Sequence, residues 1–160
     1  MTVKVGDKIP SVTLYRMTAD GPDAVTTDEL CNGKKVVLFG VPGAFTPTCS
    51  AQHVPGFLQN ADALKAKGVD TIACMSVNDA FVMGAWAKDQ GTGDAIEMLA
   101  DGSGDLTSKM GIELDLKDRG LGVRARRFSM VLDDGVVTAL NLEEGGALET
   151  SGAETLLEQL

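Results

Sequence analysis

The chain has 160 residues, 44% of them apolar, with a formal net charge of -9 and an isoelectric point near 4.5. This length suits one domain with a single core, and the acidic balance argues against nucleic acid or membranes as partners. The sequence starts without a basic segment followed by an apolar one, and no apolar run approaches ~18 residues, so we expect neither a signal peptide nor a membrane span. Three unevenly spaced cysteines are typical of reduced intracellular thiols, which predicts a cytoplasmic protein or the mature form of an organellar one.

Strand-like and helix-like segments alternate along the chain, which predicts one α/β domain over residues 1–160 with a central mixed sheet flanked by helices. In chain order we expect strands at 11–16 and 23–26, a helix at 27–30, a strand at 34–41, a helix from 49 to 67, a strand at 71–77, a helix at 78–90, a strand at 96–100, a helix at 105–110, a hairpin of 128–132 with 136–140, and a last helix from 151. We expect Asp105 to cap its helix, and Ser151 with Glu154 to form a capping box.

Cys49 stands where a strand-like run ends and a helix is expected to begin. The run 34–41 is rich in β-branched residues, and Pro42 and Pro47 then interrupt it as a loop. In a first helical turn, the unpaired N–H groups of Thr48 and Cys49 would stabilise a thiolate. An arbitrary cysteine there is more often a small apolar residue, but the composition of this loop favours a reactive one.

The spacing of Pro42, Thr46 and Cys49 gives the pattern P-x-x-x-T-x-x-C, which resembles the active-site motif of the peroxiredoxins. The wider loop resembles the peroxiredoxin V branch, also called type II or atypical. The resemblance continues through 53–57, 76–79, 99–102, 127–130 and 134–135, nearly the whole chain. It implies a thioredoxin-like fold with an N-terminal extension. It also implies a thiol-dependent peroxidase that reduces hydrogen peroxide and alkyl hydroperoxides through a sulfenic acid, in antioxidant defence and cell redox homeostasis.

Peroxide reduction requires a thiolate in line with the O–O bond and donors for the charge that develops on the leaving oxygen. The Thr46 hydroxyl and the N–H groups of Thr48 and Cys49 can bind the peroxide, while Pro42 can shield the sulfur from water. The resemblance places the active-site arginine at Arg127. We therefore expect Cys49, Thr46, Arg127 and Pro42 to be catalytic, with Thr46, Thr48, Cys49 and Arg127 binding the substrate.

The other charged and polar motifs indicate no second chemistry. We expect Arg119, Arg124 and Arg126 to be solvated, because a short basic tract in an acidic chain with one Trp and one Tyr does not favour nucleic acid. The single histidine and three separated cysteines offer no pair at zinc-ligand spacing, so we expect no metal, and nothing indicates a cofactor.

His53 lies four residues after Cys49, on the same face of the expected helix. A cysteine with a neighbouring histidine is the minimum apparatus of a thiol hydrolase. No group to orient the imidazole is evident, however, so a supporting or surface role is favoured over hydrolysis.

A sulfenic acid on Cys49 must be reduced by a thiol. Cys74 is the candidate resolving cysteine, and plant type II relatives carry one in the same context. It lies in the apolar run 71–75, which favours a buried strand residue, and a disulfide with Cys49 would need local unfolding if the Cα atoms lie beyond ~7 Å. Cys31 matches no family motif. Animal members carry a resolving cysteine where this chain has Glu149–Ser151.

The reductant is therefore expected to be an external thiol, glutathione alone or with glutaredoxin. Thioredoxin, which normally attacks a disulfide, is the alternative through a Cys49–Cys74 bond. A further alternative is a peroxide sensor or redox interaction module that stops after one equivalent. The resemblance also implies a homodimer with its interface near the active-site loop. Phe81, Val82 and Trp86 could contribute an apolar patch to this interface or could equally belong to the core.

Overall fold

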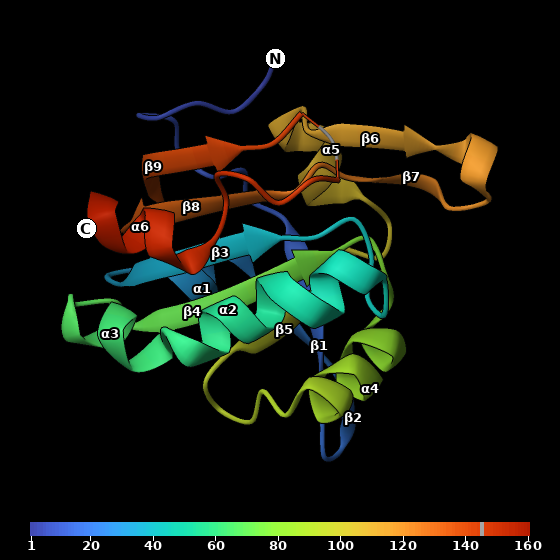
Figure 1. Cartoon of the computed structure of the whole chain (residues 1–160), viewed down its shortest axis with the longest axis horizontal. Coiled ribbons are helices and arrows are strands. Elements are labelled where there is room, and N and C mark those ends of the chain that lie inside the picture. The colour runs from blue at the N-terminus through green and yellow to red at the C-terminus, as the bar shows by residue number, and fades with distance from the viewer. Residues whose placement is uncertain (145) are drawn as a thin grey trace.

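The computed structural model describes residues 1–144 and 146–160 (Figure 1). A seven-stranded sheet crosses the molecule in the order β2-β1-β5-β4-β3-β8-β9. Its strands are β1 (Thr13–Thr18), β2 (Gly21–Thr26), β3 (Lys35–Gly40), β4 (Thr71–Ser76), β5 (Glu97–Ala100), β8 (Phe128–Asp133) and β9 (Val136–Leu142). The β3-β4 and β4-β5 pairs are parallel and the other pairs antiparallel, so the sheet is mixed.

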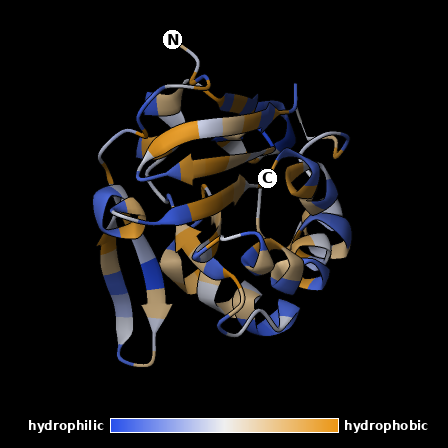
Figure 2. Cartoon of the chain, turned by 90° about the vertical axis from the view of Figure 1, so that its left-hand side faces the viewer, coloured by the Kyte–Doolittle hydropathy of each residue, from blue (hydrophilic) through white to orange (hydrophobic). Residues whose placement is uncertain are grey.

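Helices cover both faces of this sheet. They are α1 (Thr27–Cys31), α2 (Val54–Gln59), α3 (Ala61–Ala66), α4 (Ala80–Gln90), α5 (Asp105–Met110) and α6 (Ala153–Gln159), with a π-helical turn η1 (Cys49–His53) and a 3-10 turn η2 (Lys117–Arg119). On β3, Val37 and Phe39 pack into the apolar cluster under α2, α3, α4 and α6, while Val36 and Leu38 pack into the cluster with α1 and α5. Figure 2 shows the resulting apolar centre and more polar exterior.

The predicted α/β fold with a mixed central sheet is confirmed, and the β1-β2 hairpin forms the N-terminal extension at one edge. Cys49 and Cys74 belong to the first apolar cluster, whereas Cys31 belongs to the second, on the opposite face of the sheet. Among the described residues, no helix is long and apolar enough to cross a membrane.

The single helix predicted from 49 to 67 is wrong, because this segment is divided into η1, α2 and α3. In η1 the N–H of Val54 donates to the carbonyl of Cys49, five residues back. Pro55 has no N–H for a normal helical bond and its ring would crowd the preceding turn, which accounts for the wider turn. Asn60 then ends α2, and its side chain donates to the carbonyl of Gly56 at 2.8 Å.

Two predicted helix caps are also corrected. The N–H groups at the start of α5 donate to the Asp101 carboxylate, 3.1 Å from Leu106 N and 2.9 Å from Thr107 N, so Asp105 does not cap that helix. Ser151 does not cap α6, since its hydroxyl donates to the Glu143 carboxylate at 2.8 Å. At α5 a buried carboxylate from before the helix replaces the local side chain, whereas at α6 Glu143 holds Ser151 ahead of the helix and no side chain caps the first turn.

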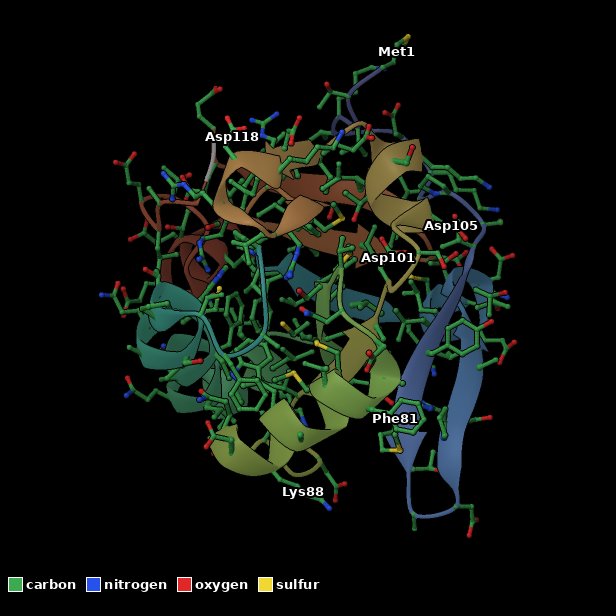
Figure 3. The ribbon with its side chains drawn as sticks, turned by 90° about the vertical axis from the view of Figure 1, so that its right-hand side faces the viewer. Met1, Phe81, Lys88, Asp101, Asp105 and Asp118 are labelled. Atoms are coloured by element: carbon green, nitrogen blue, oxygen red, sulfur yellow. The ribbon has the colours of Figure 1, made fainter. Side chains whose placement is uncertain are left out.

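A hairpin of β6 (Glu113–Leu116) and β7 (Gly122–Ala125) was not among the expected elements. Figure 1 shows it projecting at the end of the sheet where the loop after β3 also lies, and Figure 3 shows Asp118 at the turn between its strands. The alternation of Leu114 and Leu116 with acidic residues is the signal that could have identified the first strand. This hairpin supplies one wall of the cavity described below.

Candidate active site

Cys49 begins η1, directly after the loop that follows β3, and its sulfur is fully buried. Two donors converge on Sγ: the Thr46 hydroxyl at 2.9 Å and Nη2 of Arg127 at 3.1 Å. The structure thus brings together three predicted residues, which come from a loop, from a helical turn and from the position directly before β8. A hydroxyl and a guanidinium at these distances are suited to hold a negative sulfur.

The Thr46 hydroxyl lies between two acceptors. Its Oγ1 is 2.9 Å from the Cys49 sulfur and 2.7 Å from the carbonyl of Gly43. With a thiol, the hydroxyl can accept from S–H and donate to Gly43; with a thiolate, it donates to the sulfur. The same short loop therefore serves both protonation states without moving.

Arg127 is buried, 2% exposed, and every part of its fork is used. Besides the bond from Nη2 to sulfur, Nη1 donates to Nδ1 of His53 at 2.8 Å and Nε donates to the carbonyl of Gly146 at 3.0 Å. A planar guanidinium bound on three sides has little freedom to rotate. Its orientation toward the sulfur is fixed before a substrate arrives.

His53 supports Arg127 and does not lie at the surface, where the sequence also allowed it. Because an arginine only donates, Nδ1 accepts, and Nε2 therefore carries the proton that it donates to the carbonyl of Ser151 at 2.9 Å. Burial, and then the charge of Arg127, lower the pKa of His53 from 6.5 to about 4, so the imidazole is neutral at pH 7. A neutral ring engaged by Arg127 is not arranged as the base of a hydrolase.

Acidification should weaken the fold through His53. Between pH 6.5 and about 4 the unfolded chain binds a proton that the folded protein does not, so stability is lost as the pH falls through this window. At about 1.4 kcal/mol per pKa unit, the full shift corresponds to about 3 kcal/mol. Urea unfolding at pH 7.5 and pH 4.5 should show a smaller acid loss for His53→Gln than for the unmodified protein. Equal losses would contradict this assignment.

A cavity of about 460 Å³ opens in front of these residues. It is lined by Pro42, Thr46, Pro47, Thr48, Leu114, Leu116, Arg119, Leu121, Arg127 and Gly146. Pro42 is buried and Thr48 is half-buried on the wall that bears Thr46. The leucines of the β6-β7 segment form an apolar wall opposite, so the cavity has a polar base and an apolar side.

The expectation that Arg119, Arg124 and Arg126 are solvated is correct only for the exposed Arg119. Nη1 of Arg124 donates to the carbonyl of Pro42 at 3.2 Å, and Nε of Arg126 donates to the carbonyl of Glu143 at 2.8 Å. Arg124 thereby attaches the β7 strand to the active-site loop. Its close approach requires Gly43, where a Cβ atom would lie 2.7 Å from Nη1 of Arg124.

Asn78 also positions the active-site loop, a role that the sequence reasoning missed. Its Oδ1 accepts from the N–H of Ala44 at 3.0 Å and from the hydroxyl of Ser76 at 2.6 Å. Asn78 follows β4, the parallel neighbour of β3, at the carboxyl edge of the sheet. Polar residues at that edge commonly build sites in α/β folds, which is the signal that could have identified it.

No group of three or more potential metal-ligating side chains occurs within residues 1–144 and 146–160. The groups that contact the Cys49 sulfur among the described residues are a hydroxyl and a guanidinium, which suits redox chemistry at sulfur.

Comparison with known proteins gives consistent relatives. The Redoxin family model matches residues 4–157. Peroxiredoxin-2E, chloroplastic, of Arabidopsis thaliana is 55% identical over 163 residues, covering 99% of this chain and 70% of that protein. Peroxiredoxin-2B of Arabidopsis thaliana is 52% identical, covering 99% of this chain and 98% of that protein. The crystal structure of reduced Prx3 from Vibrio vulnificus in complex with hydrogen peroxide superimposes with a TM-score of 0.94 at 49% identity, covering 99% of both chains.

The fold and these matches define a thiol-dependent peroxidase built on the thioredoxin-like architecture. More particularly, the chain belongs to the peroxiredoxins and resembles their type II members, as its sequence motif predicted.

Proposed function

We propose that the protein reduces hydrogen peroxide and alkyl hydroperoxides at Cys49. The observation that supports this most directly is the convergence of the Thr46 hydroxyl and Nη2 of Arg127 on one buried sulfur, at 2.9 and 3.1 Å. The thiolate attacks one peroxide oxygen, the O–O bond breaks, and the leaving oxygen takes a proton to give water or an alcohol. The products are a sulfenic acid on Cys49 and the reduced peroxide.

Thr46 and Arg127 are proposed to act on both reactants, the Cys49 thiolate and the peroxide. Each can donate to a peroxide oxygen held beside the sulfur, and both stabilise the charge that moves from sulfur to the leaving oxygen. Pro42 is proposed to keep bulk water from the sulfur, and Thr48 to line the substrate path. The apolar wall of the cavity supports organic hydroperoxides as substrates beside hydrogen peroxide.

Glutathione, alone or with glutaredoxin, is the proposed reductant. One thiol converts the sulfenic acid to a mixed disulfide with loss of water, and a second thiol releases Cys49 and the oxidised disulfide. The other two cysteines favour this external route. Cys31 lies on the opposite face of the sheet, and burial raises the pKa of Cys74 well above its usual value, which disfavours the thiolate that resolution requires. Because the Cys49 sulfur is buried, this route also requires η1 to open so that an external thiol can reach it.

Resolution through a Cys49–Cys74 disulfide, followed by thioredoxin, is the second candidate. It is favoured by the packing of both cysteines in the same apolar cluster. A peroxide sensor would use the same Cys49 but would stop after one equivalent of peroxide, so turnover with excess glutathione separates it from a peroxidase.

The test is to add one equivalent of hydrogen peroxide to the reduced protein and to measure intact mass and peptide maps. Cys49→Ser and Cys74→Ser are treated in parallel. One added oxygen on Cys49 that is independent of Cys74 supports the proposed route. A loss of two hydrogens that depends on both cysteines would favour the thioredoxin route, and no reaction at Cys49 would overturn the proposed function.

A homodimer is proposed from an apolar surface next to the active-site loop. Phe45 is 52% exposed, and its backbone is left-handed, with φ 62°. Phe81 on α4 is 67% exposed (Figure 3). Phe45 lies 6.5 Å, between ring centroids, from Trp86 of the same helix. Holding a non-glycine residue in this conformation costs about 1–3 kcal/mol, which is understandable if a partner covers its ring. Trp86 itself is fully buried, so it belongs to the core rather than to the predicted patch.

Light scattering at micromolar concentration should therefore give the mass of a dimer. Phe81→Glu places a charge in the surface and should shift the mass toward the monomer, whereas Val136→Glu, at an exposed apolar residue of β9, should not. A monomer mass for the unmodified protein would contradict the proposal.

A cytoplasmic location and a role in cell redox homeostasis remain part of this proposal. The sequence supports an intracellular thiol enzyme, while the reported Arabidopsis relative Peroxiredoxin-2E is named as chloroplastic. Cell fractionation of the full-length protein tests the location.

A further inference from the structure

A buried carboxylate holds the segment that follows β9. Glu143 is 5% exposed and comes directly after β9. Its Oε2 accepts from the N–H groups of Glu149, Thr150 and Ser151 at 2.8, 2.8 and 3.0 Å, and from the hydroxyl of Ser151 at 2.8 Å. Its Oε1 accepts from the hydroxyl of Thr150 at 3.2 Å. Five donors from three consecutive residues thus converge on one side chain, which we name the Glu143 clamp.

The clamp is connected to the sulfur through His53. The carbonyl of Ser151, whose N–H is held by Glu143, accepts from Nε2 of His53 at 2.9 Å. Nδ1 of the same ring accepts from Nη1 of Arg127 at 2.8 Å, and Nη2 of Arg127 reaches the Cys49 sulfur at 3.1 Å. Each group in this series is fixed by the next, and the Ser151 carbonyl is what selects the tautomer that can accept from Arg127.

The backbone of Glu143 is attached to the same region. Its N–H donates to the carbonyl of Arg127 at 2.9 Å, and its carbonyl accepts from Nε of Arg126 at 2.8 Å. Glu143 therefore connects two segments: its backbone bonds to Arg127, directly before β8, and its carboxylate bonds to residues 149–151. Movement of its carboxylate would displace the Ser151 carbonyl relative to Arg127, which the backbone bonds hold in place.

We propose that Glu143 is a positioning residue for catalysis, which sets the tautomer and placement of His53 and, through it, the orientation of Arg127 toward Cys49. This inference rests on the proposed peroxidase function. Glu143 touches neither the sulfur nor the cavity, so its effect is exerted entirely through the clamp and His53.

The charge of Glu143 matters because every neighbour of its carboxylate is a donor. Burial alone would raise the pKa of this carboxyl, but the N–H groups of 149–151 and the Ser151 hydroxyl together lower it, so it is ionised at neutral pH. Protonation of the Glu143 carboxyl would turn one of its oxygens from an acceptor into a donor that faces other donors, and the clamp would open. The charged and titratable groups near the clamp are His53, Arg126, Arg127, Glu144 and Glu149, and Glu154 lines the same cavity as His53 and Glu149.

The experiment compares Glu143→Gln with Glu144→Gln. The second variant removes the same charge from the neighbouring residue, whose side chain is fully exposed. Peroxide turnover is measured from pH 5 to pH 8 with excess glutathione. His53 is the only histidine of the chain, so nitrogen NMR of histidine-labelled protein reports its tautomer without assignment. Ser151→Ala removes one of the five clamp bonds and serves as a milder variant should Glu143→Gln fold poorly.

We expect Glu143→Gln to lose about tenfold in the rate of peroxide reduction at neutral pH, because it misplaces the arginine. Its imidazole signal should shift toward a mixture of tautomers, and its deficit should persist from pH 8 to pH 5, because the donors around Glu143 lower the pKa of its carboxyl and keep the clamp ionised over this range. Glu144→Gln should retain both rate and signal, and Ser151→Ala should lose about threefold.

A rate within twofold of the unmodified protein overturns the inference, and so does a lower rate with an unchanged imidazole signal, since the effect would then bypass His53. If the unmodified protein turns over no peroxide, the proposed function fails instead. The imidazole signal alone then decides the positioning role, and an unchanged signal in Glu143→Gln overturns it.

Discussion

Arg127→Lys should lower the second-order rate constant for peroxide reduction by about 10²–10³-fold, the loss typical of removing one fixed donor from a transition state. A lysine ammonium is a single point that cannot bind the Cys49 sulfur, the His53 ring and the Gly146 carbonyl together, as the guanidinium does. The variant keeps a positive charge, so the loss measures orientation more than charge. Stopped-flow measurement with hydrogen peroxide determines the rate constant.

The control for this substitution is Arg16→Lys on β1. Arg16 is bonded to Glu97 and Asp23 near the far edge of the sheet, so the change has the same chemistry without reaching Cys49. Both variants are first compared in urea unfolding, because a lysine at a position 2% exposed can also cost stability. An Arg127→Lys variant that folds and keeps more than a third of the rate would show that the fork geometry is not needed.

The sequence predicted the elements whose signals are local. The run at 34–41 is a buried strand as its composition indicates, and Asp79 caps α4 by accepting from Val82 N at 2.8 Å. The tight 133–135 turn also closes the expected β8-β9 hairpin, with Asp134 and Gly135 at positive φ. These patterns depend on neighbours in the chain, so they can be seen without the fold.

Side-chain hydrogen bonds that local capping and spacing rules do not describe account for most of what the sequence did not predict. Glu143 holds Ser151, and Asp101 holds the start of α5, so the nearby side chains that fit local capping rules are not the ones used. The same applies to the site. The motif identifies Thr46 and Cys49, and the resemblance identifies Arg127, but nothing in the sequence indicates that His53 contacts Arg127 across 74 positions of the chain.

Thr46→Val should lower the rate constant for peroxide reduction by about 100-fold, since it removes one donor from the sulfur and keeps the volume of the side chain. The hydroxyl is 2.9 Å from Sγ of Cys49 and can donate to the thiolate or to a peroxide oxygen beside it. Valine offers only a methyl group there. Stopped-flow kinetics with hydrogen peroxide and with an alkyl hydroperoxide measure the loss for both substrates.

Thr46→Ser is the matched control, because it keeps the hydroxyl and removes only the methyl group. We expect its rate to stay within a few-fold of the unmodified protein. The carbonyl of Gly43, 2.7 Å from the threonine hydroxyl, gives a second readout. In Thr46→Val this carbonyl loses its donor, so the loop is also destabilised, whereas serine retains it. Equal rates for the valine and serine variants would mean that the hydroxyl has no part in the reaction and that other donors, Arg127 among them, stabilise the charge.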